Sequence, residues 1–155
     1  MDFKQVTAPR EPVIVPGAII MPYKYFAGAC ASKFFIELRD NKRIMGIRCP
    51  LCNRVYVPPC STCACCFSKL DEWVEVDKRG TVTSYAMVNY HLPVHPVEAP
   101  FFYGIIQLDG ADTGLVHFLG EVGLEEVRIG MRVEAVFKQQ GEGNILDIKY
   151  FKPLK

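Results

Sequence analysis

Alternating apolar and polar residues in the second half of the chain predict a series of β-strands. The alternation is clearest where Met131, Val133 and Ala135 are separated by the charged residues Arg132 and Glu134. Glycine-containing turn signals such as Asp-Gly separate the apolar runs, as they do in β-hairpins. We expect strands at residues 73–76, 81–90, 101–108, 114–119, 131–137 and 145–151.

The order of these elements indicates a small barrel. A short helical turn is expected at residues 124–127, between the third and fourth of the long strands. About five strands with one short helix at that place are typical of a Greek-key barrel of the OB type. The predicted fold class is therefore mainly β, with a five-stranded OB-fold barrel over residues 71–155.

A four-residue period predicts an N-terminal helix over residues 23–42. Phe26, Phe34 and Leu38 lie on this spacing, and Phe35 widens the apolar stripe. This face could pack on the chain's own core or dock on another subunit, and the pattern does not decide between the two. All four residues are therefore candidates for a partner interface.

Residues 1–22 form the segment before the predicted helix and contain four prolines and two short apolar runs. Proline at this density is incompatible with a helix and favours an extended arm. Such an arm needs an apolar surface to lie on, which this domain or a partner could supply.

Composition and charge narrow the range of functions. The chain has 155 residues, of which 50% are hydrophobic and 23% are charged, as is ordinary for a globular protein. A formal net charge of +1 argues against a protein that binds nucleic acid by neutralising many phosphates. No apolar run reaches the ~20 residues that span a bilayer, and the polar N-terminal residues do not resemble a secretory signal. Seven cysteines without such a signal favour a cytoplasmic location, where thiols stay reduced.

The cysteine spacing predicts a structural zinc site in residues 43–70. Cys49 and Cys52 form one Cys-x-x-Cys motif, and Cys63 and Cys66 form a second one after ten intervening residues. Each motif turns two thiolates toward one point, so that two motifs supply the four-sulfur tetrahedron that zinc accepts. Iron is the alternative metal, since four thiolates also hold iron. Four protein ligands leave no position for a catalytic water, so the metal should stabilise a small ribbon and not take part in chemistry.

A second choice of ligands remains open, because Cys60 and Cys63 also form a Cys-x-x-Cys motif. That choice leaves seven residues between the motifs, two of them rigid prolines, whereas pairing Cys63 with Cys66 leaves ten for a return strand. We prefer the longer spacing. Cys60 and Cys65 are then spare thiols, expected to be small and partly buried residues without a redox role.

The order of several landmarks resembles a known family. The resemblance rests on Cys49-Pro-Leu-Cys-Asn-Arg-Val-Tyr-Val-Pro-Pro, the second cysteine motif, Trp73, Gly80-Thr-Val-Thr-Ser-Tyr, Ala99-Pro-Phe and Ile129-Gly-Met-Arg-Val. From about residue 23 onward the chain is similar to acyl-CoA-associated proteins in which a rubredoxin-like zinc ribbon precedes an OB-fold, a family long known only as a domain of unknown function. It departs from the family pattern at Cys60, where a basic residue is more usual, and in the proline-rich arm.

The resemblance implies a function as well as a fold. Members of the family are small partner subunits of thiolase-like enzymes, including those of benzoylsuccinyl-CoA thiolases. They are thought to bridge subunits and to help enclose the CoA thioester, while the partner supplies the nucleophile. The chain is therefore expected to be a cytoplasmic, non-catalytic subunit of a hetero-oligomer, with structural zinc and with acyl-CoA as a possible shared ligand.

CoA carries phosphates, and a group of basic residues is a candidate to bind them. Between residues 39 and 54, five basic residues stand against one acidic residue. The same group could be an ordinary solvated surface, which is the usual role of a charge run. The candidates are Arg39, Lys42, Arg43, Arg48 and Arg54.

Two other functions compete with the accessory subunit. Zinc ribbons and OB-folds also bind single-stranded nucleic acids, but acidic residues outnumber basic ones over residues 71–155. An independent thiol enzyme would use Cys30, Cys60 or Cys65, yet no histidine lies close to them in the sequence.

The histidines do not indicate a catalytic site. His91 and His95 lie in a proline-rich stretch between two strands, and His117 lies within a strand. The sequence contains no Ser-His-Asp order, nucleophile elbow or close pair of acids. Charge and the lack of a long apolar run disfavour nucleic acid and a membrane as partners, and the family resemblance implies a thiolase-like catalytic subunit as the main partner.

Overall fold

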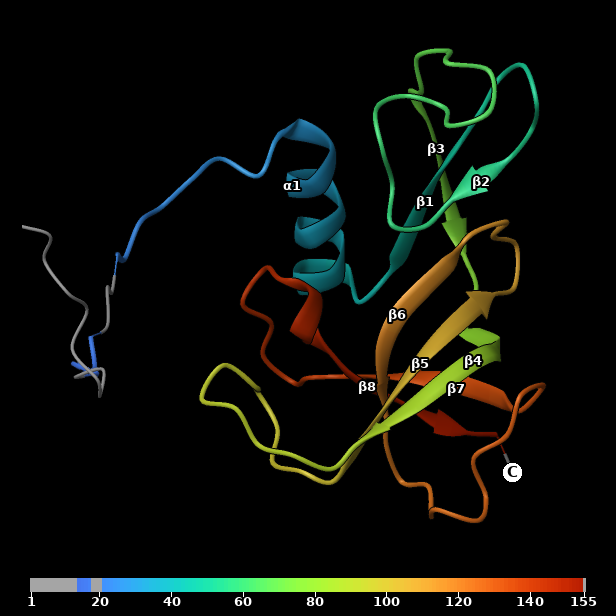
Figure 1. Ribbon diagram of the computed structural model, residues 1–155. Helices are drawn as coiled ribbons and strands as arrows, with labels where there is room; N and C mark the ends of the chain where they lie inside the picture. Colours follow the sequence, from blue (N-terminus) through green and yellow to red (C-terminus); the bar gives the residue numbers. More distant parts are fainter. Residues whose placement is uncertain (1–13, 18–20, 155) are drawn as a thin grey trace, which may run out of the picture.

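The chain folds into a helix, a three-stranded ribbon and a closed barrel, in this order along the sequence (Figure 1). This computed structural model describes residues 14–17 and 21–154. Most of the predicted arm lies outside the described residues. Residues 14–17 and 21–28 form neither helix nor strand, and the apolar side chains of Ile14, Val15 and Met21 are exposed.

The helix is shorter than its apolar period predicted. α1 (Ala29–Ile36) continues into a π-helical turn, η1 (Glu37–Asn41), and residues 21–28 are not helical. The reason is local, because Gly28 has a φ of 90°, which a right-handed helix does not accommodate. The aromatic side chains before Gly28 are exposed, so they bury no surface that would stabilise further turns.

The ribbon is an antiparallel sheet of three short strands. β1 (Ile44–Arg48) lies between β2 (Val55–Tyr56) and β3 (Glu72–Val76). Residues 72–76, counted with the barrel in the sequence, therefore belong to the sheet of the ribbon. The sequence pattern showed a strand there but could not show its partner, since pairing is set by tertiary contacts.

The barrel has the predicted OB topology. Its strands pair in the order β4-β5-β6-β8-β7, and β7 pairs again with β4 to close the barrel. β6 and β8 are parallel, and the other pairs are antiparallel. The strands are β4 (Arg79–Val88), β5 (Phe101–Leu108), β6 (Gly114–Leu119), β7 (Arg132–Phe137) and β8 (Ile148–Pro153).

Two local predictions differ from the structure. The helical turn expected at residues 124–127 is a single turn in which the Glu126 N–H donates to the Gly123 carbonyl at 3.0 Å. The last predicted strand begins as a 3₁₀ turn, η2 (Ile145–Asp147), because the Asn144 side chain accepts a hydrogen bond from the Leu146 N–H. Asn side chains stabilise such turns in competition with a strand ladder.

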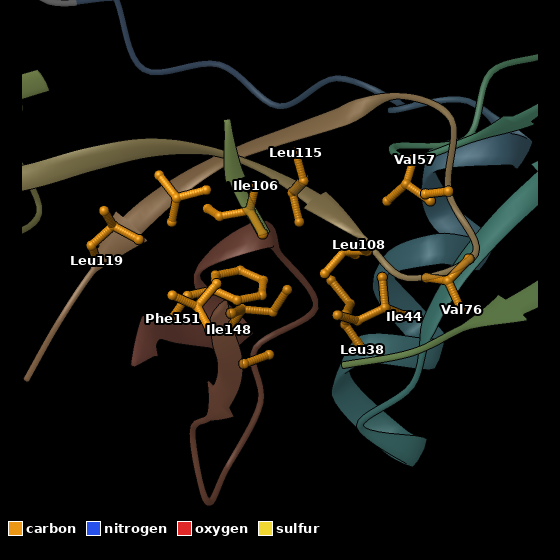
Figure 2. Packing of buried hydrophobic residues seen from close by; sticks show 14 of the residues in the cluster. Leu38, Ile44, Val57, Val76, Ile106, Leu108, Leu115, Leu119, Ile148 and Phe151 are labelled. Atoms are coloured by element: carbon orange, nitrogen blue, oxygen red, sulfur yellow. The ribbon is translucent and has the colours of Figure 1, made fainter. Parts of the chain in front are cut away.

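One apolar core runs from the helix through the ribbon into the barrel (Figure 2). Phe34 and Leu38 are each 1% exposed and belong to the same cluster as Phe151 of the barrel. Figure 2 shows Leu38 and Ile44 beside Leu108 of β5. The inner face of the helix therefore packs on the chain's own core, which was one of the two alternatives left by its pattern.

Hydrogen bonds also fix the ribbon to the barrel. The turn between β5 and β6 contributes Asp112, whose carboxylate accepts from the Val55 N–H at 2.8 Å and whose N–H donates to the Val55 carbonyl at 2.9 Å. The Thr113 hydroxyl accepts from the Val57 N–H at 2.7 Å and donates to the Val57 carbonyl at 2.9 Å. These bonds hold β2, the strand between the two cysteine motifs, against the barrel.

Candidate metal centre

Four cysteine sulfurs meet in the loops at one end of the ribbon (upper part of Figure 1). The Sγ atoms of Cys49, Cys52, Cys63 and Cys66 lie within 4.8 Å of one another. The Cys49–Cys66 and Cys52–Cys63 Sγ distances are 3.4 and 3.6 Å, too long for a disulfide. Zinc–sulfur bonds of about 2.3 Å in a tetrahedron place sulfurs about 3.8 Å apart. The cluster can therefore hold a metal ion, and its donors and spacing are consistent with structural zinc.

The two cysteine motifs fold into the same local structure. In the first, the Asn53 N–H donates to the Cys49 carbonyl at 2.9 Å, and the Cys49 N–H donates to the Arg54 carbonyl at 2.8 Å. The second repeats this pattern at the same offsets with bonds of 3.0 and 2.9 Å from the Phe67 and Cys63 N–H groups. Asn53 and Phe67 have left-handed φ values of 58° and 59°, which turn the chain back after each motif. This symmetry directs both sulfur pairs toward one point.

Two hydroxyl groups contact the sulfurs from outside the ligand set. The Tyr56 hydroxyl lies 3.2 Å from the Cys63 sulfur, and the Ser68 hydroxyl lies 3.2 Å from the sulfurs of both Cys49 and Cys66. A hydroxyl donates its single proton to one thiolate, so Tyr56 orients Cys63 and Ser68 orients either Cys49 or Cys66. Neither contact was predicted from the sequence; the available signals were a tyrosine in the strand between the motifs and a serine two positions after the last cysteine.

The surroundings of Cys63 favour the form of the side chain that binds metal. Hydrogen bonds from the Tyr56 hydroxyl, and then from the backbone N–H groups of Cys66 and Cys65, lower the pKa of the Cys63 thiol to about 5. The thiolate is the zinc ligand, so the protein prepares this sulfur for binding. Cys49 and Cys63 are completely buried, whereas Cys52 and Cys66 are partly exposed.

The remaining cysteines lie outside the cluster. The Cys60 thiol donates to the Thr62 carbonyl at 3.3 Å, and Cys60 and Cys30 both pack against the small core of the ribbon. Burial, and then the proximity of Cys60, raise the pKa of the Cys30 thiol, so it is not activated as a nucleophile. Cys65 is exposed. The geometry thus brings together the preferred ligand set and leaves Cys60 aside.

The five candidate residues for CoA phosphates differ in whether an acidic side chain pairs with them. Three of the five pair with acids: Arg39 with Asp40 at 2.7 Å, Arg43 with Glu37 at 2.7 Å, and Arg48 with Glu72 at 3.6 Å. Within the described part of the chain, Lys42 and Arg54 form no salt bridge. Their charges are the ones available to a phosphate.

The candidate interface residues divide in a similar way. Phe34 and Leu38 are buried inside the chain, where no partner reaches them. Phe26, before α1, is 80% exposed, and Phe35 is partly buried. Phe26 and Phe35 are therefore the members of this set that a partner could contact.

His117 and His95 are engaged within the protein. His117 is 2% exposed; its Nε2–H donates to the Ile145 carbonyl at 3.1 Å, and its Nδ1 accepts from the Phe118 N–H at 2.8 Å. His91 and His95 lie in the loop between β4 and β5, where the His95 ring contacts Phe101 edge-on. Over residues 14–17 and 21–154, the four cysteines are the only group of metal-binding side chains. No helix in that part of the chain is long and apolar enough to cross a membrane.

Known proteins are similar to this chain in sequence. Residues 73–138 match the family described as the C-terminal OB-fold domain of ChsH2. A DUF35 domain-containing scaffold protein of Methanocaldococcus jannaschii is 29% identical over 124 residues, which cover 77% of this chain and 87% of that protein. A probable enoyl-CoA hydratase alpha subunit of Thermomonospora curvata is 31% identical over 101 residues, 64% of this chain but only 31% of that subunit.

Two solved structures whose names also include DUF35 have a similar fold. A chain of the Ltp2-ChsH2(DUF35) aldolase superposes with a TM-score of 0.61 and 27% identity, covering 83% of this chain and 98% of that one. A DUF35 protein of unknown function from Sulfolobus solfataricus superposes with a TM-score of 0.57 and 26% identity, covering 70% and 78% of the two chains. The ribbon with its four cysteines and the closed barrel fit these matches: the chain is similar to proteins of the DUF35 family, and its barrel is an OB-fold.

Proposed function

We propose that this chain is a non-catalytic accessory subunit of an acyl-CoA-processing enzyme, and specifically of a thiolase-like acyltransferase. The observation that carries the proposal is the match to 98% of a chain of the Ltp2-ChsH2(DUF35) aldolase. Two further relatives are named as a scaffold protein and as a subunit of a probable enoyl-CoA hydratase. Both names describe parts of larger assemblies, and an accessory part of such an assembly is the role proposed here.

The chemistry of the described residues supports an accessory role. Four thiolates complete the coordination of a zinc ion and leave no open position for a water or a substrate. His117, a buried histidine, has both ring nitrogens in hydrogen bonds. The nucleophile and the general base are therefore expected on the partner, and the zinc of this chain stabilises the ribbon.

Exposed apolar residues before α1 support a bound partner. Tyr23, Tyr25 and Phe26 are each about four-fifths exposed, at 78%, 78% and 80%. This segment extends away from the rest of the molecule in Figure 1 and has no secondary structure of its own. Large apolar side chains in such a segment are stabilised by a groove on another protein.

The available cations support contact with CoA. Lys42 follows η1 and precedes β1, and Arg54 lies in the turn between β1 and β2. We propose that they bind phosphates of CoA in the assembled enzyme. Replacing both by alanine should weaken CoA binding to the assembled enzyme about tenfold or more, measured by calorimetry, while Lys149→Ala on β8 leaves it unchanged. Equal affinities for all three proteins would contradict a CoA contact at this place.

Affinity capture tests the accessory role itself. The tagged chain, isolated from its native host, should retain an enzyme subunit that mass spectrometry identifies as thiolase-like, in a fixed ratio and with acyl-CoA activity. Capture of an acyl-CoA enzyme of another class would keep the accessory role and remove the thiolase assignment. Isolation of this chain alone, without any enzyme subunit, would contradict the proposal.

A further inference from the structure

Three neighbouring strands of the barrel are almost free of charge. Across β4, β5 and their connecting loop, the charged residues are Arg79, at the start of β4, and Glu98, in the loop; β6 has none. The other two strands, β7 and β8, each carry two charged residues: Arg132, Glu134, Lys149 and Lys152. The barrel thus has an uncharged side and a charged side.

The uncharged side exposes large apolar side chains. Ile105 and Val116 are directly paired across β5 and β6 and are 40% and 58% exposed. With Tyr85, Ala86 and Tyr103 they line a shallow depression of about 170 Å³. We call residues 84–86, 103–105 and 116 the neutral face.

The neutral face continues into the loop between β4 and β5. A chain of ring contacts leads from Tyr103 to Phe101 at 5.4 Å, on to His95 at 5.3 Å, and on to Tyr90 at 5.7 Å. This loop, which extends from the barrel at the lower left of Figure 1, also exposes Leu92 and Val94. Phe101 itself is buried, so the ring contacts join the face to the loop below the surface, and the apolar side chains exposed on both mark an interaction site.

The charge of the face limits what can bind there. OB-folds bind oligonucleotides on this side of the barrel, with basic grooves that follow the phosphates. The neutral face has no lysine or arginine, so neither a nucleic acid nor the phosphates of CoA find a counter-charge on it. A charged protein surface would leave its own charges desolvated and unpaired. The complementary occupant is an uncharged protein surface with an apolar side chain that fills the depression.

We infer that the neutral face is the docking surface for the enzyme subunit, an inference that rests on the proposed function. The matched chain belongs to the Ltp2-ChsH2(DUF35) aldolase, which favours an enzyme subunit over a second copy of this chain. The partner therefore presents an uncharged, apolar patch that covers Ile105 and Val116. A charge introduced at either position is buried in the complex without a partner group.

Two variants and a matched control test the docking surface. Tagged Val116→Glu and Ile105→Glu should each retain at least about tenfold less of the captured enzyme subunit than the wild type. Ile129→Glu is the control, because Ile129 is an exposed apolar residue (67%) outside the neutral face; it should retain the wild-type amount. Zinc content and thermal unfolding verify that each variant is folded. Hydrogen exchange of the wild-type complex adds a test without mutation: residues 84–86, 103–105 and 114–118 should gain protection.

The outcomes separate this inference from the proposed function. Equal capture by all variants without protection of the neutral face would overturn the docking surface and leave the accessory role intact. A wild-type chain that captures no enzyme subunit would overturn both. A chain that forms a dimer by itself, and a monomer as Val116→Glu, would assign the face to a second copy and overturn the inference.

Discussion

At the scale of single residues, hydroxyl groups beside the cysteines complete the metal centre. Tyr56 contacts the Cys63 sulfur, and Ser68 contacts two of the other sulfurs. Such partners orient ligands and reduce the charge on each sulfur. The cysteines could be predicted from their spacing, whereas these hydroxyls depend on how the chain turns after each motif.

The ligand set leads to the first prediction. Cys66→Ser should lose zinc, because it removes one of the four converging sulfurs, whereas Cys60→Ser should keep one zinc per chain. Metal content of the purified proteins, measured by atomic emission, distinguishes the two. Zinc lost from Cys60→Ser and kept in Cys66→Ser would assign the fourth ligand to the other motif.

The role of Tyr56 leads to the second prediction. Tyr56→Phe keeps the buried ring and removes the hydroxyl that contacts Cys63, so zinc affinity should fall about 10- to 100-fold. Competition with a chromogenic chelator measures the affinity. Tyr150→Phe is the matched control, because its hydroxyl donates to Glu121, outside the metal centre. Equal affinity in both variants would show that the hydroxyl is not needed.

Burial lowers the pKa of His117, which gives stability a pH dependence. The native state then holds the neutral ring at a pH where the unfolded chain, with a pKa of about 6.5, already binds a proton. This part of the stability is present above pH 6.5 and is lost as the pH falls from there toward the lower folded pKa. The free energy of unfolding of the wild type should therefore fall more between pH 7.0 and 5.5 than that of His117→Gln. Parallel curves for the two proteins in denaturant titrations would rule out this contribution.

At the scale of elements, the sequence predicted where strands lie better than it predicted which strands pair. The barrel strands are near their expected positions, since alternation along a strand is a local property. The start of the helix was wrong by six residues, because the φ of Gly28 and the lack of packing before it are not visible in an apolar period. β3 was wrongly counted with the barrel, because its pairing with β1 is a tertiary contact that a local pattern does not show.

Leu38 joins the π-helical turn to the barrel and carries the prediction at this scale. Leu38→Ala should lower the free energy of unfolding by about 2–5 kcal/mol, because it leaves a cavity in the shared core. Ile36→Ala, at an exposed position nearby, should cost much less. Urea unfolding of both variants measures the difference. Similar losses would show that the helix is not part of the core.

At the scale of the whole molecule, the fold places the ribbon, the helix and the neutral face on one rigid frame. Hydrogen bonds between Val55, Val57 and the β5–β6 turn hold the metal centre against the barrel. The order of ribbon and barrel could be predicted from sequence because each has a local signature. The uncharged side of the barrel could not, since it arises only when β4, β5 and β6 pair.

The most direct test of the accessory role is the turnover of acyl-CoA by the purified, zinc-loaded chain, alone and together with the captured enzyme subunit. We predict no turnover by the chain alone and full activity once the two are combined, because the proposed function assigns the catalytic groups to the partner. Sustained turnover of an acyl-CoA by this chain alone would contradict it.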